Sequence, residues 1–97
     1  MQNGLMDITI RYCAAWNHTP RAVSLTDEIL KEREIEYFVK SWTMIPATGG
    51  VFDVTVNDEL VFSKKKIGRH AESGEVRAAI MKVLDTLRPA DFVLPED

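Results

Sequence analysis

Two strand-like runs separated by only two residues constrain the fold of this chain more than any other feature. The runs are Val51–Val56 and Glu59–Ser63, and Asn57 and Asp58 stand between them. Both of these residues tolerate the left-handed backbone conformation that a two-residue turn requires. The sequence therefore predicts an antiparallel hairpin over residues 51–63.

A strand followed by a helix is predicted near the N-terminus. Residues 7–12 alternate between polar and apolar side chains, which is the period of a strand with one buried face. Thr19 is a suitable helix cap, and Pro20 suits the first helical position, where no amide hydrogen is needed. The apolar stripe of this helix consists of Ala22, Leu25 and Ile29.

A second strand is predicted over residues 35–45, and a last helix is predicted between Ser73, its expected cap, and Arg88-Pro89. The apolar face of that helix is Val76, Ala79, Ile80, Val83, Leu84 and Leu87. The element order is β-α-β-β-β-α, with a parallel first crossover and an antiparallel hairpin. We therefore predict an α/β (α+β) fold of thioredoxin-like plan, with a four-stranded mixed sheet and two helices.

The 97 residues suffice for one domain with its own core. We expect a flexible segment at 1–6, the folded domain at 7–88 and a disordered acidic tail at 89–97. An alternative for the tail is that its apolar residues dock on the domain; these are Phe92, Val93 and Leu94. The single cysteine excludes a disulfide within the chain.

Composition argues against several classes of function. A net charge of −3 gives no attraction to nucleic acid. No apolar run is long enough to span a membrane, and the first residues lack the pattern of a secretion signal, so a cytoplasmic location is expected. The spacing of the two histidines and the cysteine matches no metal-binding motif, so no metal is expected.

The cysteine lies where chemistry is expected in a thioredoxin-like plan. Cys13 follows the first strand and precedes the first helix, whose N-terminus would favour a thiolate. Redox sites of this layout normally carry a second sulfur three residues later, as Cys-x-x-Cys. Here that position is Trp16.

Several blocks of the chain resemble the Rdx family, the thioredoxin-like group that includes selenoproteins W, T and H and bacterial relatives. The matching blocks are Tyr12-Cys13, Arg21-Ala22, residues 48–54, residues 61–65 and the terminal helix, within residues 6–88. The resemblance implies a bacterial-type member in which Trp16 replaces the second cysteine or selenocysteine. It also implies thiol-based redox work with glutathione or protein thiols, for which only Cys13 remains.

Two functions stay open at this point, and so does the question of whether the protein is an enzyme. Cys13 is either a reactive lone thiol, cleared by an external thiol such as glutathione, or a buried structural residue. Trp16 either fills the space of the lost sulfur or is an exposed anchor for a partner. The alternative to redox work is therefore a redox-inactive protein-interaction module, with a surface around Trp16, Gly49-Gly50 and Phe52. The chain is expected to be a monomer or a homodimer.

The remaining candidates each have two interpretations. His18 and His70 are acid/base groups near Cys13 or exposed loop histidines without a role. The run Lys64–Lys66 is a solvated strand end or a patch for an anionic partner or the carboxylates of glutathione. By analogy with thioredoxin-like folds, four residues are expected to line a groove facing the cysteine: Thr48, Gly49, Gly50 and Val51.

Overall fold

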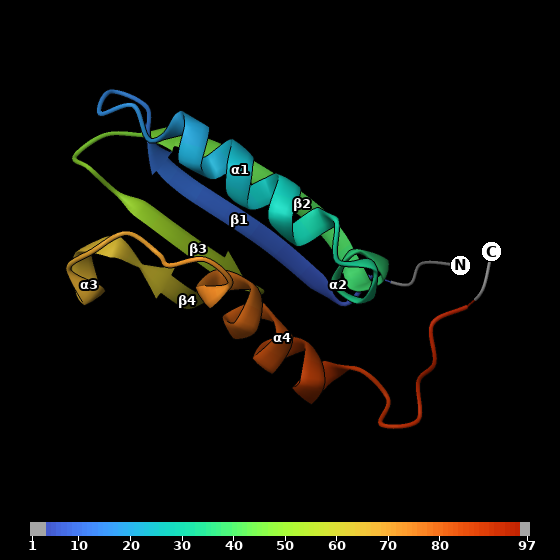
Figure 1. Cartoon of the computed structure of the whole chain (residues 1–97). Helices are drawn as coiled ribbons and strands as arrows, with labels where there is room; N and C mark the ends of the chain where they lie inside the picture. The colour runs from blue at the N-terminus through green and yellow to red at the C-terminus, as the bar shows by residue number, and fades with distance from the viewer. Residues whose placement is uncertain (1–3, 96–97) are drawn as a thin grey trace.

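The computed structural model describes residues 4–95, which form one mixed sheet and four helices (Figure 1). In chain order these elements are β1 Met6–Cys13, α1 Thr19–Leu30, α2 Arg33–Phe38, β2 Val39–Ala47, β3 Phe52–Val56, β4 Glu59–Ser63, α3 Lys64–Ile67 and α4 Glu75–Leu87. The strand order is β2-β1-β3-β4. β1 pairs parallel with β2 and antiparallel with β3, and β3 pairs antiparallel with β4. The predicted α+β class with a four-stranded mixed sheet is confirmed, and two short helices are added to the two predicted.

The hairpin turn is built as its two residues predict. Asn57 and Asp58 have φ angles of 50° and 69°. The Asn57 side chain also reaches the start of β1, where its Oδ1 accepts the Asp7 amide hydrogen at 2.8 Å and its Nδ2 donates to the Leu5 carbonyl at 3.0 Å. The turn of the hairpin therefore fixes the beginning of the central strand as well as its own two strands.

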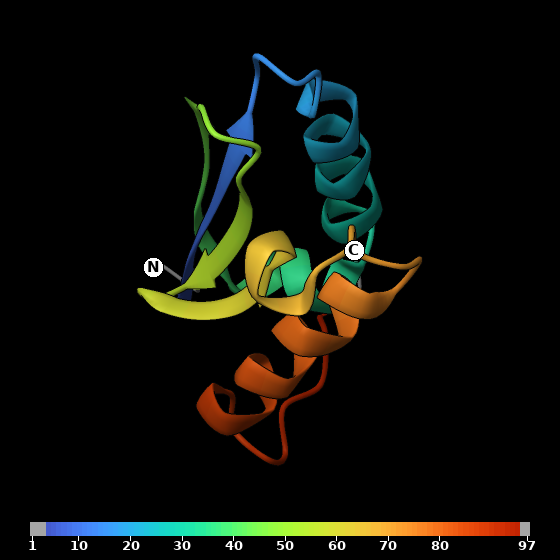
Figure 2. The same cartoon turned by 90° about the vertical axis from the view of Figure 1, so that its left-hand side faces the viewer.

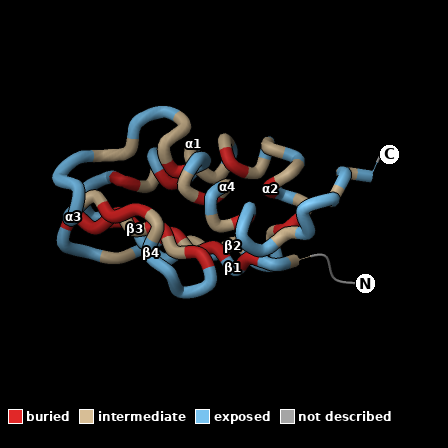
Figure 3. Tube along the Cα trace, turned by 90° about the horizontal axis from the view of Figure 1, so that it is seen from below, coloured by how far each residue is buried: buried red, intermediate tan, exposed pale blue. Residues whose placement is uncertain are grey.

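The core lies on one face of the sheet, between the strands and the helices α1 and α4 (Figure 2). On β1 the alternation holds: Met6, Ile8 and Ile10 are fully buried. The burial colouring shows the same concentration along the strands and the inner sides of the helices (Figure 3). The opposite face carries polar side chains, including a row in which Thr9 of β1 pairs with Thr43 of β2 and Thr55 of β3. Both long helices thus cover the same side, and the other face of the sheet stays open.

The predicted strand over residues 35–45 is wrong in its first part. Residues Arg33–Phe38 form α2, and the strand begins only at Val39. Ile35 and Phe38 are both buried, and their spacing of three residues brings both to one face of a helix, which alternation in a strand would not do. Trp42 then points toward α1, where its Nε1 donates to Thr26 Oγ1 at 3.0 Å.

The predicted helix caps are also wrong. His18 takes the N-cap position of α1, Thr19 is the first helical residue, and Pro20 is the second helical residue instead of the first. Gly74, with a φ of 80°, precedes α4 in place of Ser73. The basic stretch after β4 is a helical turn, α3, whose cap Ser63 accepts the Lys66 amide hydrogen through its hydroxyl at 3.4 Å.

The ends of the domain differ from the expected boundaries. The predicted flexible segment 1–6 extends too far into the domain, because Met6 is buried in β1 and the Leu5 amide donates to the Phe38 carbonyl at 2.7 Å. Residues 1–3 of that segment lie outside the described part. In the tail, Phe92 packs on Phe38 with ring centroids 4.7 Å apart, whereas Val93 is 82% exposed. Phe92 is therefore docked on the domain, as the alternative prediction for the tail has it. Residues 96–97 lie outside the described part.

Candidate functional site

Cys13 is the last residue of β1, and its side chain is 0% exposed. Its amide hydrogen is donated to the Val51 carbonyl at 2.8 Å, and its carbonyl accepts the His18 amide hydrogen at 3.0 Å. Contrary to the expected layout, the thiol does not start the helix, because the turn 14–17 and His18 separate it from Thr19. A substrate sulfur can reach the fully buried Cys13 only after a local opening of the structure.

Trp16, at the second motif position, is 63% exposed, in contrast to the buried Cys13. The interpretation that it fills the core in place of a sulfur is therefore wrong. The six-membered ring of the indole lies against Gly50: a Cβ built at that glycine would meet Trp16 Cζ3 at 2.6 Å. The Lys64 Nζ lies 5.7 Å from the ring centroid, within the range of a cation–π contact. The indole is thus held in place while most of it faces solvent.

The loop 48–51 lies beside Cys13 and Trp16, at the same end of the sheet as the turn 14–17 (Figure 1). Thr48 and Gly49 are exposed, whereas Gly50 and Val51 are buried. The carbonyl of Gly50 accepts from Lys64 Nζ at 3.4 Å, and that of Val51 accepts from Cys13. The loop is therefore adjacent to the cysteine, as the analogy predicted, but these two carbonyls already have donors.

His18 is buried, at 7% exposure, and the expectation of an exposed loop histidine is wrong. Its ring makes edge-on contacts with Trp16 and Phe52, both with centroids 6.5 Å away, and with His70 at 4.7 Å. Its Nε2 is buried and has no hydrogen-bond partner among the described residues. The sequence gives no local signal of this burial, because the covering residues come from distant segments.

His70 packs against the rings of His18 and Phe52. Burial lowers the pKa of His70 below its usual 6.5, and the positive charges of Arg21, a protonated His18 and Lys64 lower it further. The imidazole is therefore neutral near pH 7. His70 and His18 come together from two loops, which the sequence did not predict.

The His70→Gln variant should have a weaker pH dependence of stability than the wild type. Because the folded state lowers the pKa of His70, the unfolded chain binds this proton more readily. The unfolding free energy that this difference in pKa contributes is present above pH 6.5, and it is lost as the pH falls toward the pKa of His70 in the folded state. Urea unfolding at about pH 7.5 and about pH 5 measures this effect. An equal loss of unfolding free energy in both proteins would contradict it.

The lysine run lies next to the indole. Lys64 contacts both Gly50 and Trp16, and the Lys65 Nζ lies 3.6 Å from the position of a Cβ built on Gly49. We call the group formed by Trp16, Gly49, Gly50, Lys64 and Lys65 the Trp16 surface. Its residues come from a turn, a loop and a helix that lie far apart in the sequence.

Two further observations concern the whole described part of the chain. Within residues 4–95, no three His, Cys, Asp or Glu side chains come together in a way that could hold a metal ion. None of the helices there has the length and apolar character needed to cross a membrane.

Comparison with known proteins identifies related folds and a family. The model of the Rdx family matches residues 7–82. A selenoprotein W-related protein from Vibrio cholerae superposes with a TM-score of 0.74 at 25% identity, over 82% of this chain and 98% of that one. A protein from Bordetella parapertussis superposes with a TM-score of 0.68 at 24% identity, over 84% of this chain and 98% of that one. No curated protein matches the chain.

Proposed function

This chain belongs to the Rdx family. We propose that this member is a protein-binding module whose contact surface is the Trp16 surface. The observation that carries the proposal is the reversal of exposure within the motif. The thiol at the first position is 0% exposed, and the indole at the second is 63% exposed. An exposed ring at the position where relatives place a second sulfur is suited to contact rather than to disulfide exchange.

The indole meets the requirements of a binding anchor. Tryptophan is enriched among the residues that contribute most to interfaces, because it buries a large apolar area and has few rotatable bonds. Here Gly50 and Lys64 hold the ring before any partner arrives. Less side-chain freedom is therefore lost on binding than for an unsupported surface tryptophan.

The charge around the ring supports one class of partner. Lys64, Lys65 and Lys66 lie on α3, whose first two lysines border the loop under the indole. A positive patch of this kind attracts a negatively charged segment and excludes a basic one. We therefore propose an acidic, extended protein segment that carries an apolar residue for contact with Trp16.

A library of random peptides displayed on phage tests this function directly. Selection on the folded protein should enrich peptides rich in Asp and Glu, with binding that weakens as salt rises. Trp16→Ala should lose these peptides, whereas Cys13→Ser should keep them, because the thiol lies outside the contact surface. Enrichment that is equal for Trp16→Ala, or peptides without acidic residues, would refute the proposal.

A lone-thiol function of Cys13 is the second candidate, supported by its place at the first motif position. In this reaction the Cys13 thiolate attacks one sulfur of a protein disulfide, the S–S bond breaks, and one substrate thiolate leaves. A glutathione thiolate then attacks the Cys13 sulfur of the mixed disulfide, which releases the second substrate thiolate. A second glutathione thiolate attacks the sulfur of the bound glutathione, which frees the Cys13 thiolate and forms glutathione disulfide, so that the substrate is reduced and two glutathione molecules are oxidised. Because Cys13 is fully buried, every such cycle needs a prior local opening that exposes the thiol.

A further inference from the structure

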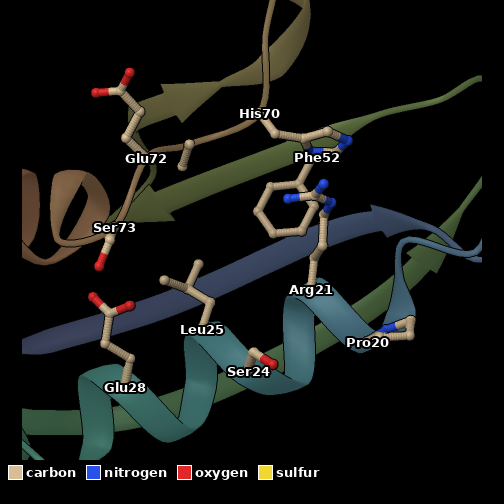
Figure 4. A pocket seen from close by; sticks show the side chains of 10 residues that line it. Pro20, Arg21, Ser24, Leu25, Glu28, Phe52, His70, Glu72 and Ser73 are labelled. Carbon is tan, nitrogen blue, oxygen red and sulfur yellow. The ribbon is translucent and has the colours of Figure 1, made fainter.

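A groove separate from the Trp16 surface lies between α1 and the segment that joins α3 to α4 (Figure 4). Its volume is about 320 Å³, at the lower end of the range for small-molecule sites. Six of its lining residues carry the argument: Arg21, Leu25, Glu28, Phe52, His70 and Glu72. We call it the α1 groove. Cys13 and Trp16 do not line it.

The two ends of the α1 groove carry opposite charge. Arg21 and His70 lie together at one end, beside the ring of Phe52, and Glu28 lies at the other end (Figure 4). Glu72 lies on the wall opposite Glu28, and its carboxylate points away from Glu28. Within residues 4–95, the side chains of Arg21 and Glu28 form no ion pair and no hydrogen bond with protein atoms. These two charges are therefore available to a ligand in the groove.

The middle of the groove is apolar. Leu25 lies between Arg21 and Glu28, the ring of Phe52 extends the apolar surface toward Arg21, and Ala71 also lines the groove. Phe52 is 3% exposed, so its ring belongs to the core and gives this floor a fixed position. An occupant should therefore carry an apolar group between two charged ends.

The spacing along α1 sets the length of the occupant. Arg21 and Glu28 are seven positions apart on one helix, which corresponds to a rise of about 10 Å. In an extended peptide each residue spans roughly 3.3–3.6 Å, so the charged termini of about three residues match this distance. A free amino acid, whose two charges share one carbon atom, is too short to reach both ends.

We propose that the α1 groove binds a short peptide with free termini, about three residues long. Its carboxylate contacts Arg21, with His70 available as a neutral hydrogen-bonding group. Its terminal ammonium contacts Glu28, and its central apolar side chain packs on Leu25 and Phe52. Glutathione fits less well, because the α-carboxylate of its γ-glutamyl group would lie beside Glu28.

Titration of the full chain with the tripeptide Ala-Leu-Ala, followed by NMR, tests the site. Amide signals of residues 21–28 and 70–73 should shift. Amidation of the peptide should weaken binding to the wild type by about threefold to tenfold, and so should its N-acetylation, as expected for partly exposed charge contacts. Glutathione should bind more weakly than Ala-Leu-Ala.

Two variants show whether the charges act as assigned. Amidation should have no further effect in Arg21→Gln, and acetylation a reduced effect in Glu28→Gln, because each variant lacks a partner for that terminus. Asp27→Asn is the matched control for Glu28→Gln, because it also removes one negative charge from α1, at an exposed residue outside the groove. This control should bind the peptide like the wild type.

Three results would overturn the proposal. They are an absence of shifts in the groove at millimolar peptide, an undiminished effect of amidation in Arg21→Gln, and an undiminished effect of acetylation in Glu28→Gln. Cys13→Ser and Trp16→Ala should leave peptide binding unchanged. Failure of the α1 groove is therefore distinguishable from failure of the Trp16 surface or of the lone thiol.

Discussion

Cys13 in the folded protein should react with iodoacetamide at least about 100-fold more slowly than in the urea-unfolded chain, because the reagent must wait for an opening that costs several kcal/mol. The physical basis is the complete burial of the side chain together with two backbone hydrogen bonds, one to Val51 and one from His18. Mass spectrometry after timed quenching measures both rates at one pH.

An exposed cysteine in the same turn provides the control. In the Cys13→Ser background, Ala15→Cys places a thiol at an exposed position two residues away, and it should react nearly as fast as in the unfolded chain. If native Cys13 reacted at a similar rate to this control, the thiol would be accessible. The lone-thiol function would then take precedence over the binding module.

The Gly50→Ala variant should lose about 2–4 kcal/mol of unfolding free energy and should displace the indole of Trp16. Gly50 has a φ of 73°, so alanine meets left-handed backbone strain there. In addition, its methyl group would lie 2.6 Å from the Trp16 ring, closer than contact permits. Urea unfolding gives the stability, and the NMR signal of the indole N–H reports the ring.

The neighbouring glycine separates the two contributions. Gly49 has a nearly equal φ of 76°, but a Cβ there would meet only Lys65 Nζ, at 3.6 Å. Gly49→Ala should therefore cost only the backbone term of about 1–2 kcal/mol and leave the indole signal in place. If the two variants were equally stable, the glycine would not be needed to hold Trp16, and the preformed anchor would lose its support.

The parts of the fold that were predictable depend on contacts between residues close in sequence. The hairpin could be predicted because Asn57-Asp58 determines the turn by itself. The parallel crossover followed from a helix placed between two strands. The segment Arg33–Phe38 could not be assigned correctly, because its apolar residues suit both a strand and a short helix. Packing of Phe38 against Phe92 of the tail is a contact that no local pattern reveals.

The candidate site was predictable in position but not in exposure. The end of β1 placed Cys13 and Trp16 at one end of the sheet, beside the loop 48–51. Which of the two side chains faces solvent depends on the backbone of Gly50 and on Lys64, which the sequence does not place. The burial of His18 has the same origin, because Phe52 and His70 cover it from distant segments.

The position of β1 in the sheet determines when the protein can fold during synthesis. β1 is a central strand, flanked by β2 and β3, yet it is synthesised before the other three strands of its sheet. Its apolar side chains have no complete partner surface until Val56 has emerged from the ribosome, and α4 completes that surface later still. The nascent chain therefore carries the apolar face of β1 without its full cover until the hairpin and α4 have been synthesised.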